Sequence, residues 1–359
     1  MRRTLLLASI LLAGTAAVAQ ADYPERTITM IVPFAAGGPT DTVGRLVAEA
    51  MSKDLGQQVI VENVGGAGGT LGAARVAKAD PDGYTLLMYH IGQATSGSLY
   101  RKLSYDPAAD FAAIGRVTDV PMSIIGRAGL APNNAEELIA YVREHKDELT
   151  LANAGPGSSS HLCGMLFQSA VGVPLTTVPY KGTAPAMTDL LGGQVDLVCD
   201  QTTNTTGQIR SGKVKAYAVT TKDRVAALSD LPTLDEAGLP GFEMSVWHGL
   251  WAPAGTPPET IAKLTTALGH ALEDPKVIER FADLGTVPVP AAEVTPIALQ
   301  SQTAAETKKW QPIIAGAVPL YGTVVSGTPT ADWNSMPHKC ELEPGPAFAS
   351  VSSSLCSRT

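Results

Sequence analysis

Three short segments combine glycine with hydroxyl or acidic side chains, each where an apolar run gives way to a helical pattern. They are Ala35–Asp41, Gly155–Ser160 and Gly182–Pro185. The unpaired N–H groups and partial positive charge of a helix N-terminus attract anions, and glycine lets the backbone approach a ligand closely. Four hydroxyls add to these backbone donors: Ser158, Ser159, Ser160 and Thr183. We expect a small carboxylate to be held mainly by backbone dipoles, with ordinary turns as the alternative for each segment.

Two acidic residues and two histidines could lie at the same site. Asp196 and Asp200 are four residues apart on one predicted strand, so both face the same side of the sheet. We expect one to be structural and Asp200, at the strand's end, to accept a hydrogen bond from a ligand. His90 ends another predicted strand and His248 follows Trp247. Either histidine could pair with the second carboxylate of a diacid, and a structural histidine remains the alternative for each.

The common signatures of catalysis and cofactor binding are missing. Ser158, His161 and Asp200 could be arranged as a hydrolase triad, but Ser158 is in no G-x-S-x-G motif. The glycines of Gly66–Gly69 lack the register of a dinucleotide loop, and no G-x-x-x-x-G-K-[ST] motif occurs. No C-x-x-C pair or histidine cluster suits zinc. We predict no enzyme activity, no cofactor and no metal site.

The elements that position these residues alternate between strand and helix. β-rich runs bounded by turn residues predict strands at 27–34, 59–63, 84–89, 122–125, 149–153, 176–180, 195–199 and 216–220. Helical apolar spacing predicts helices at 43–51, 71–79, 134–146, 162–170 and 258–272, and residues 181–185 open a further predicted helix that runs to 191. Thr40 or Asp41 is the predicted N-cap of the first helix. The alternation predicts an α/β fold with parallel or mixed sheets covered by helices on both faces.

Length and the change of elements along the chain predict two domains. The 359 residues suit two domains of about 100–200 residues each. We expect hinge-like crossings near 115–120 and 238–247. These make 119–240 the second domain, and 22–118 together with 241–317 the first. Residues 318–359 are rich in Ser, Thr, Pro and Gly and are predicted to be a disordered or non-native tail.

The first residues and the overall charge indicate the compartment and the class of partner. Arg2 and Arg3 precede an apolar run, Leu5–Val18, which ends in Ala19-Gln20-Ala21. This pattern is typical of a cleaved secretory signal peptide, here residues 1–21, and the run is too short to span a bilayer. We therefore expect an exported, periplasmic protein. The formal net charge of -8 argues against nucleic-acid binding.

Cysteine pairing follows from the expected compartment. Four cysteines would lie in an oxidising environment, where disulfides form. Cys163 and Cys199 fall in regular segments, whereas Cys340 and Cys356 fall in the predicted tail. We predict a Cys163–Cys199 bridge, with two buried free thiols as the alternative.

An ordered set of motifs resembles one known family. In chain order they are Pro33-Phe34-x-x-Gly37-Gly38-x-x-Asp41-x-x-x-Arg45, Glu62-Asn63-x-x-Gly66-Ala67-Gly68-Gly69, Asp82-Gly83-Tyr84-Thr85-Leu86-Leu87, Gly155-x-Gly157-Ser158-x-x-His161-Leu162, Val178-Pro179-Tyr180-Lys181-Gly182, Asp189-Leu190-Leu191-Gly192-Gly193-Gln194-Val195-Asp196 and Ala252-Pro253-Ala254-Gly255-Thr256-Pro257. The set, which runs from about residue 23 to 317, resembles the Bug family. Members of this family are the extracytoplasmic solute receptors of tripartite tricarboxylate transporters.

The resemblance implies a two-domain, Venus-flytrap receptor of the type II periplasmic-binding-protein class, with the ligand in a cleft between the domains. It implies a ligand carboxylate held by residues of both domains: Phe34, Gly38, Thr40, Asp41, Gly157, Ser158, Ser159, Thr183 and Ala184, with Asp200 at the opposite end. From its place at a strand end, His90 is added to this set. The implied partners are the membrane permease subunits of such a transporter, and we expect a monomer.

The motifs do not choose among the family's ligands, which include citrate, acidic amino acids, nicotinate and aromatic acids. Tyr89-His90 and Trp247-His248 offer aromatic surface and a second acid anchor, which favours an aromatic mono- or dicarboxylate such as terephthalate. Citrate-like and other aliphatic carboxylates remain the alternative. Two other functions compete with transport: a signalling receptor that presents the same ligand to a membrane sensor, and a periplasmic hydrolase that uses Ser158.

Overall fold

Residues 23–321, which the computed structural model describes, alternate strands with helices and confirm the predicted α/β class. The strands are β1 (Ile28–Val32), β2 (Val59–Asn63), β3 (Thr85–His90), β4 (Phe111–Arg127), β5 (Thr150–Asn153), β6 (Thr176–Pro179), β7 (Leu197–Gln201), β8 (Val214–Val219), β9 (Ser245–Pro253) and β10 (Val287–Pro288). The helices are α1 (Pro39–Leu55), α2 (Thr70–Ala77), α3 (Gly92–Leu99), α4 (Ala135–Glu144), α5 (Ser159–Val171), α6 (Thr183–Leu191), α7 (Thr202–Arg210), α8 (Pro258–Glu273), α9 (Pro275–Asp283) and α10 (Pro296–Tyr321). The sequence analysis predicted neither helices α3, α7, α9 and α10 nor strands β9 and β10. The small and polar residues of α3 and α7 have no clear apolar period.

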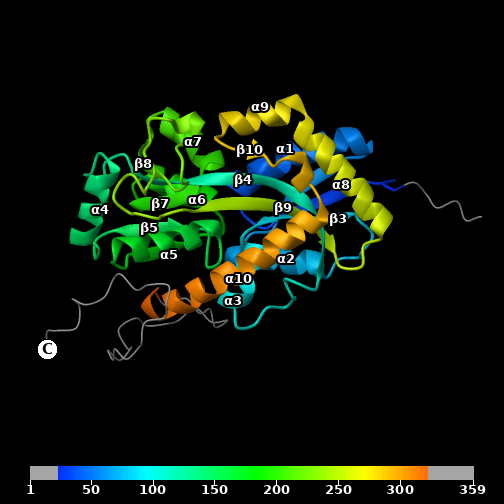
Figure 1. The fold of residues 1–359 in the computed structure, drawn as a ribbon, viewed down its shortest axis with the longest axis horizontal. Coiled ribbons are helices and arrows are strands. Elements are labelled where there is room, and N and C mark those ends of the chain that lie inside the picture. The colour runs from blue at the N-terminus through cyan, green and yellow to red at the C-terminus, as the bar shows by residue number, and fades with distance from the viewer. Residues whose placement is uncertain (1–22, 322–359) are drawn as a thin grey trace, which may run out of the picture. The chain divides into compact units, whose positions relative to one another are not determined.

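The strands of the described part form one ten-stranded mixed sheet. Its order is β2-β1-β3-β9-β4-β7-β5-β6, and β8 and β10 each pair with β4. Parallel pairs at both ends are joined by the antiparallel strands β4 and β9. In Figure 1 these two strands run across the middle of the described part toward the green elements. We call β1–β3, β9, β10 and the start of β4 the first half of the sheet, and β5–β8 with the end of β4 the second half.

Neighbouring residues of the central strands enter different cores. Leu86 and Met88 of β3 pack in a cluster with residues of α1 and α8. Leu87 and Tyr89 belong to another cluster, which continues into the second half of the sheet. Successive side chains of a strand point to opposite faces, so a strand buried on both faces reads as a continuous apolar run. This double burial explains why these strands show no polar alternation.

The predicted N-cap of the first helix is wrong. Helix α1 begins at Pro39, and Gly38 caps it without a side-chain hydrogen bond. Proline suits the first helical position, because its φ is fixed and its missing N–H would have had no partner there. Asp41 lies inside the first turn, where its carboxylate accepts hydrogen bonds from the Gly37 N–H at 2.8 Å and Arg45 Nε at 2.9 Å. These bonds fix the loop that precedes the helix.

Strand β4 passes through the expected first crossing without a break. Its 17 residues pair with β9 over Phe111–Pro121 and then with β7 over Met122–Gly126. The pairing with β9 shifts register twice, once on either side of Gly115–Arg116. The connection near 115–120 is therefore part of the sheet rather than a free linker, and β9 makes the second crossing beside it.

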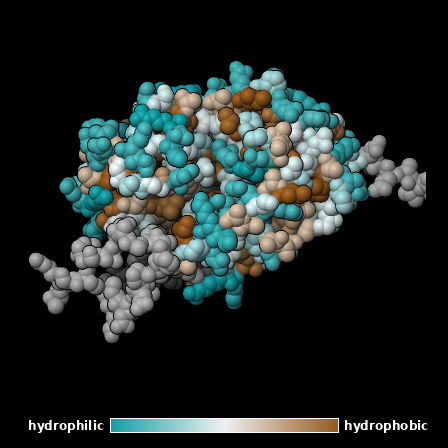
Figure 2. Space-filling view, viewed as in Figure 1, coloured by the Kyte–Doolittle hydropathy of each residue, from teal (hydrophilic) through white to brown (hydrophobic). Residues whose placement is uncertain are grey.

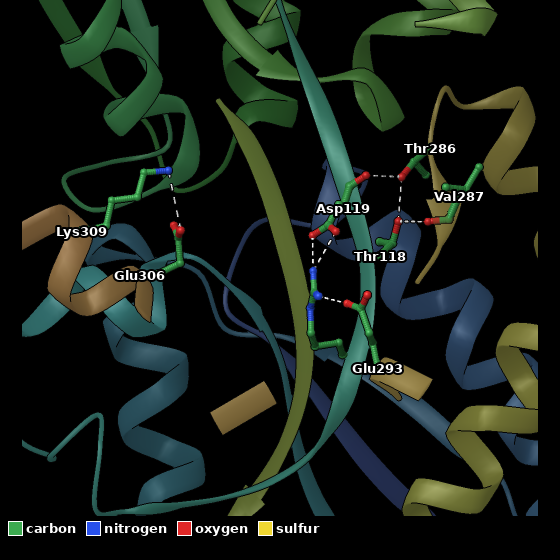
Figure 3. Close-up of polar contacts among 8 residues, drawn as sticks. Thr118, Asp119, Thr286, Val287, Glu293, Glu306 and Lys309 are labelled. Carbon is green, nitrogen blue, oxygen red and sulfur yellow. Dashed lines mark hydrogen bonds and ion pairs between the residues drawn. The ribbon is translucent and has the colours of Figure 1, made fainter. Parts of the chain in front are cut away.

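Side chains fasten β4 where it leaves the first half of the sheet (Figure 3). Arg116 Nη2 donates to both carboxylate oxygens of Asp119 at 2.7 Å, and Arg116 Nη1 pairs with Glu293. The Thr286 hydroxyl donates to the Asp119 carbonyl oxygen at 2.9 Å. The Thr118 hydroxyl lies 2.7 Å from that of Thr286. The segment after α9 thus holds the crossing strand from one side.

Two predicted segments fall wholly or partly outside the described residues. The predicted signal peptide, 1–21, lies outside them. Helix α10 continues to Tyr321, so residues 318–321 are helical rather than part of the predicted tail, while 322–359 lie outside. Within residues 23–321, none of the helices is both long and apolar enough to cross a membrane. On the face shown in Figure 2, hydrophobic residues form small groups among hydrophilic ones.

A disulfide joins Cys163 of α5 to Cys199 of β7, which confirms the predicted pair. Both cysteines are fully buried, and their Cα atoms are 6.1 Å apart. Helix α5 begins at the Ser158–Ser160 segment, and β7 ends at Asp200 and Gln201. The bond therefore ties together two elements whose ends carry predicted site residues.

Replacing both cysteines, Cys163→Ala with Cys199→Ala, should lower the free energy of unfolding. The bond closes a loop across 36 positions, and the loss of that constraint on the unfolded chain corresponds to about 3–4 kcal/mol. Urea unfolding followed by circular dichroism measures the change. Reductant should destabilise the parent protein by a similar amount and leave the double variant unaffected. Equal stability of variant and parent would contradict the expectation.

Candidate functional site

One cavity of the described part is lined by residues from both halves of the sheet. The lining residues are Phe34, Pro39, Thr40, His90, Ala154, Ser158, Ser159, Thr183, Asp200 and Gln201. Seven of the eleven predicted ligand-binding residues are among them: Phe34, Thr40, His90, Ser158, Ser159, Thr183 and Asp200. The cavity volume is about 10 Å³, room for about one water molecule and far below the ~300–1,000 Å³ that is usual for drug-sized ligands. The two halves of the sheet therefore lie close together around these residues.

Four helices begin at this cavity, and a fifth, α3, begins beside it. Pro39 and Thr40 open α1, and Ser158 caps α5. Thr183 opens α6, and Gln201 caps α7. Helix α3 begins two residues after the strand end that brings His90 to the cavity. Each N-terminus contributes unpaired N–H groups and a partial positive charge, so together they favour an anion although no lysine or arginine lines the cavity.

The hydroxyls of the second half are held in defined positions. Ser158 Oγ accepts a hydrogen bond from the His161 N–H at 3.2 Å, as an N-cap does. Ser159 Oγ accepts one from Gln201 Nε2 at 3.2 Å. The Thr183 hydroxyl lies beside the Asp200 carboxylate and acts to lower its pKa. Gln201 Oε1 is buried and has no hydrogen-bond partner within the described residues, whereas buried polar atoms are normally paired.

Asp200 is fully buried at the end of β7. Its Oδ1 accepts a hydrogen bond from the Gln201 N–H at 2.8 Å, and its Oδ2 accepts one from Asn204 Nδ2 at 2.6 Å. Burial raises the pKa of the Asp200 carboxyl to about 6, although the hydrogen bonds act in the opposite direction. Asp196 is structural, since its carboxylate accepts from Arg127 Nε at 2.8 Å away from the cavity.

Three buried histidines surround the site, and His90 is the one that lines the cavity. The His90 Nδ1 atom accepts a hydrogen bond from the Gly92 N–H at 3.0 Å, and His161 Nδ1 accepts one from the Gly157 N–H at 3.3 Å. Burial lowers the pKa of His161 to about 4 and of His248 to about 3, and it lowers the pKa of His90 well below its usual value. All three rings are therefore neutral near neutral pH.

Asp41 is a positioning residue rather than part of the cavity wall. Its side chain is buried, and its carboxylate accepts from Gly37, Arg45 and Asn63 Nδ2, the last at 2.8 Å. Burial acts to raise the pKa of Asp41, but the hydrogen bonds from Arg45, Gly37 and Asn63 outweigh it and hold the pKa below its usual value. Since these partners occupy the carboxylate, Asp41 shapes the loop before α1.

The other three predicted residues that do not line the cavity also shape its loops. Gly157 has φ of +82° and donates its N–H to His161, so this N–H is not free for a ligand. Gly38 caps α1, and a Cβ built on it would lie 3.8 Å from the Ala184 backbone nitrogen of α6. Gly38 and Ala184 therefore face each other from the two halves of the sheet.

The aromatic residues differ from their predicted placement. The Phe34 ring stacks on His90, with centroids 4.9 Å apart and 25° between the planes. Tyr89 does not line the cavity, and its hydroxyl donates to the Gly68 carbonyl oxygen at 2.8 Å. Trp247 does not line it either. His248 reaches it only indirectly, because its Nε2 lies 3.3 Å from Thr40 Oγ1.

The hydrogen bonds do not join Ser158, His161 and Asp200 into a triad. Ser158 Oγ interacts with the backbone of His161 and, at 3.1 Å, with Ser160 Oγ. The His161 ring accepts from Gly157, and Asp200 is bonded to Gln201 and Asn204. No group of three or more His, Cys, Asp or Glu side chains within residues 23–321 could hold a metal ion.

Three lining residues were missing from the predicted set: Pro39, Ala154 and Gln201. Pro39 lies inside the first glycine segment, and Ala154 immediately precedes the second. Gln201 directly follows Asp200 at the carboxyl end of a buried strand, which is where ligands bind in open α/β sheets. Position at a strand end, rather than residue type, was the signal that could have found them.

Comparison with known sequences gives one family. A family model described as "Tripartite tricarboxylate transporter family receptor" matches residues 43–317. The "UPF0065 protein in the TAR-I ttuE-ttuC' intergenic region" of Agrobacterium vitis is 57% identical over 301 residues, which is 84% of this chain and 87% of that protein. The protein BugT of Bordetella pertussis is 37% identical over 305 residues, or 84% of this chain and 93% of BugT.

Solved structures of similar proteins share the fold. The periplasmic binding protein BugD is 55% identical with a TM-score of 0.81, over 82% of this chain and 98% of BugD. MatC from Rhodopseudomonas palustris, with bound malate, is 42% identical with a TM-score of 0.79, over 81% of this chain and 100% of MatC. Rpa4515 from R. palustris, with adipate, is 35% identical with a TM-score of 0.79, over 83% and 99% of the two chains.

Replacing Asp200 by Asn should change how stability depends on pH. The pKa of Asp200 is raised from 3.8 to about 6, so its protonated form stabilises the fold below about pH 4, and this contribution is lost as the pH rises through about 6. The difference amounts to on the order of 3 kcal/mol, roughly half of it between about pH 5 and about pH 7.5. Between about pH 5 and about pH 7.5, the unfolding free energy of the parent protein should fall by about 1.5 kcal/mol relative to that of Asp200→Asn.

Urea unfolding of both proteins at several pH values measures this difference. The contributions of the buried histidines to the pH dependence cancel, because both proteins contain them. Asp196→Asn is the matched control. The pKa of Asp196 is lowered, because hydrogen bonds from Arg127 and Thr150 outweigh the effect of burial, which acts to raise it. Its ionisation is thus complete over the tested range, and the control should differ from the parent by a constant amount. A pH-independent difference for Asp200→Asn would contradict the assignment.

Proposed function

The chain belongs to the tripartite tricarboxylate transporter receptor family, and on that premise we propose that it captures one small carboxylate outside the cytoplasmic membrane and delivers it to a membrane permease. The observation that carries the proposal is the cavity at which four helices begin, lined among the described residues by hydroxyls and by no lysine or arginine. Such a site recognises a carboxylate through N–H and O–H donors. We propose no catalytic activity.

An aliphatic dicarboxylate is the first candidate ligand. Two relatives of this fold, 42% and 35% identical to the chain, hold malate and adipate. An aromatic acid such as terephthalate is the second candidate, and the Phe34 ring beside the cavity is the observation that favours it.

We further propose that the two halves of the sheet close on the ligand as domains, 22–118 with 241–317 against 119–240. The Ala35 N–H donates to the Lys181 carbonyl oxygen at 3.1 Å, which links the two halves beside the cavity. Glycines allow this close approach. A Cβ on Gly182 would lie 2.8 Å from the Ala35 nitrogen, and a Cβ on Gly68 would overlap the Pro156 carbonyl oxygen. Closure would let both halves contact the same ligand.

Export and partners complete the proposal. Residues 1–21 would direct the chain to the periplasm and be removed there. The receptor would act as a monomer and dock in its closed form on the permease subunits. The signalling alternative, in which a membrane sensor reads the closed form, uses the same ligand site and differs only in the partner. Capture of the permease by the liganded receptor distinguishes the two.

A thermal-shift series on the exported chain tests carboxylate binding. Malate, adipate, citrate and terephthalate are each compared with malamide, a neutral analogue of malate. A bound ligand stabilises the folded state by mass action, by about 2.7 kcal/mol at a hundredfold excess over its Kd. At least one acid should raise the Tm, and malamide should not. No rise with any acid, on protein freed of bound ligand by unfolding and refolding, would end the proposal.

Removing single hydroxyls should weaken binding of the acid that gives the largest shift. Ser158→Ala and Thr183→Val each remove a donor worth about 1.5–3 kcal/mol to a charged group, which corresponds to a roughly 10- to 150-fold higher Kd. Thr188→Val is the control on the same helix as Thr183, because its hydroxyl donates to the Ala184 carbonyl at 3.3 Å. Titration calorimetry reads the affinities, and unchanged Kd values in both site variants would refute their assigned roles.

Gly182→Ala should weaken binding by obstructing closure. Its φ is 166°, which any residue adopts, so the added Cβ meets only Ala35 from the other half of the sheet. An overlap of this kind costs about 1–3 kcal/mol, equivalent to a roughly 5- to 150-fold higher Kd. Gly207→Ala, at a position with no neighbouring atom within 4 Å, is the control. Equal affinity in the two variants would speak against closure along this contact.

A further inference from the structure

The cavity holds one acidic side chain and no basic one. Among its lining residues, Asp200 is the single carboxylate, and neither lysine nor arginine is present. A carboxylate ligand would therefore bring a second negative charge beside a buried first one. Two carboxylates that share a site cannot both ionise easily, because each disfavours the charged form of the other. Either the dipoles of the surrounding helices offset the whole charge, or a proton is taken up.

The titratable groups on the elements that surround the cavity limit where a proton can go. His90 from β3 and His161 from α5 each use Nδ1 to accept a backbone N–H, so protonation at Nδ1 would break that hydrogen bond. His248 from β9 is fully buried and does not line the cavity. Asp41 from α1 is ionised and paired with Arg45 at 2.9 Å. None of these groups is suited to take up a proton when an anion binds.

Asp200 differs from the histidines in this respect. Its Oδ1 accepts a hydrogen bond from the Gln201 N–H and its Oδ2 accepts one from Asn204 Nδ2, and the Thr183 hydroxyl lies beside the carboxylate. A carboxylate oxygen has two lone pairs, so the group can be protonated while both hydrogen bonds persist. The protonated form gains an O–H that can donate into the cavity. The raised pKa of Asp200, about 6, places this proton within reach near neutral pH.

We infer that binding of a carboxylate is coupled to the uptake of one proton by Asp200, whose O–H then donates to the bound ligand. This inference rests on the proposed function. The proton comes from solvent and returns to it when the ligand leaves. Asp200 thus acts as a hydrogen-bond donor in the complex and as a carboxylate in the free protein, which removes the need for a basic residue at this end of the cavity.

The coupling has a defined sign. Uptake of a proton on binding makes the complex more stable at lower pH, so the Kd rises with pH wherever free Asp200 is ionised. The change approaches tenfold per pH unit for one full proton. Between about pH 6.5 and about pH 8.5 an ordinary carboxylic acid is already ionised in water, so titration of the free ligand contributes little in that range.

Titration calorimetry with malate and adipate tests the inference on the exported chain. Heats measured in buffers of different ionisation enthalpy give the number of protons taken up. We expect a value approaching one near about pH 7 and a Kd that increases by up to about tenfold per unit from about pH 6.5 to about pH 8.5. Binding with no proton uptake and a constant Kd would overturn the inference and leave the proposed function intact. Absence of binding at every pH, by these acids and by citrate and terephthalate, would remove the proposed function as well.

Three variants identify the group that takes up the proton. Asp200→Asn should bind without proton uptake and with a Kd independent of pH. Asp196→Asn, four residues away and paired with Arg127 outside the cavity, should keep the behaviour of the parent. If Asp200→Asn fails to fold, the exchange Asp200→Asn with Asn204→Asp restores the side-chain pair in reverse order and should also lose the coupling. Proton uptake that persists without Asp200 would assign it to another group and refute the inference.

Discussion

The alignment of peptide dipoles at one cavity is the interaction on which the site depends. Four helices begin there, α1, α5, α6 and α7, and each follows a strand in the chain. The unpaired N–H groups of the helix ends are fixed by the fold itself, so they need no reorganisation when an anion arrives. The same arrangement explains the composition of the wall. Because backbone dipoles supply the positive potential, small hydroxyl residues such as Ser159 and Thr183 are sufficient as side-chain donors to an anion. Their small size lets the backbone approach the anion closely.

The antiparallel strands β4 and β9 give this arrangement its geometry. Each parallel block carries helix N-termini on its own, but only the continuous sheet brings the ends of both blocks to a common cavity. Arg116 and Thr286 fasten β4 at the crossing, and the Cys163–Cys199 bond ties α5 to β7 within the second half. None of these residues is among those that line the cavity. They determine where Ser158 and Asp200 stand without touching the space that a ligand would occupy.

The sequence was sufficient for the fold class and for most of the cavity wall, because both follow from local patterns. Strand ends, glycine loops and hydroxyls are visible at Ala35–Asp41 and Gly155–Ser160, and the Cys163–Cys199 pair follows from compartment and placement. Contacts between residues distant in the chain were not visible in the sequence. Asp41 was predicted to contact ligand, and in the structure its carboxylate accepts a hydrogen bond from Asn63 of another strand. Tyr89 was predicted to offer aromatic surface, but its hydroxyl is bound to Gly68. No local period shows either contact.

Because the cavity has no basic side chain and the chain is acidic, the association rate and the affinity for an anion depend on different interactions. The formal charge of -8 repels an approaching anion over a distance of roughly 10 Å, the Debye length at ordinary ionic strength, whereas dipoles act only close to the helix ends. Added salt screens the repulsion and leaves the buried hydrogen bonds nearly unchanged. A receptor of this design binds anions with an association rate that rises with ionic strength. The association rate of a receptor that attracts anions with a basic patch falls with ionic strength.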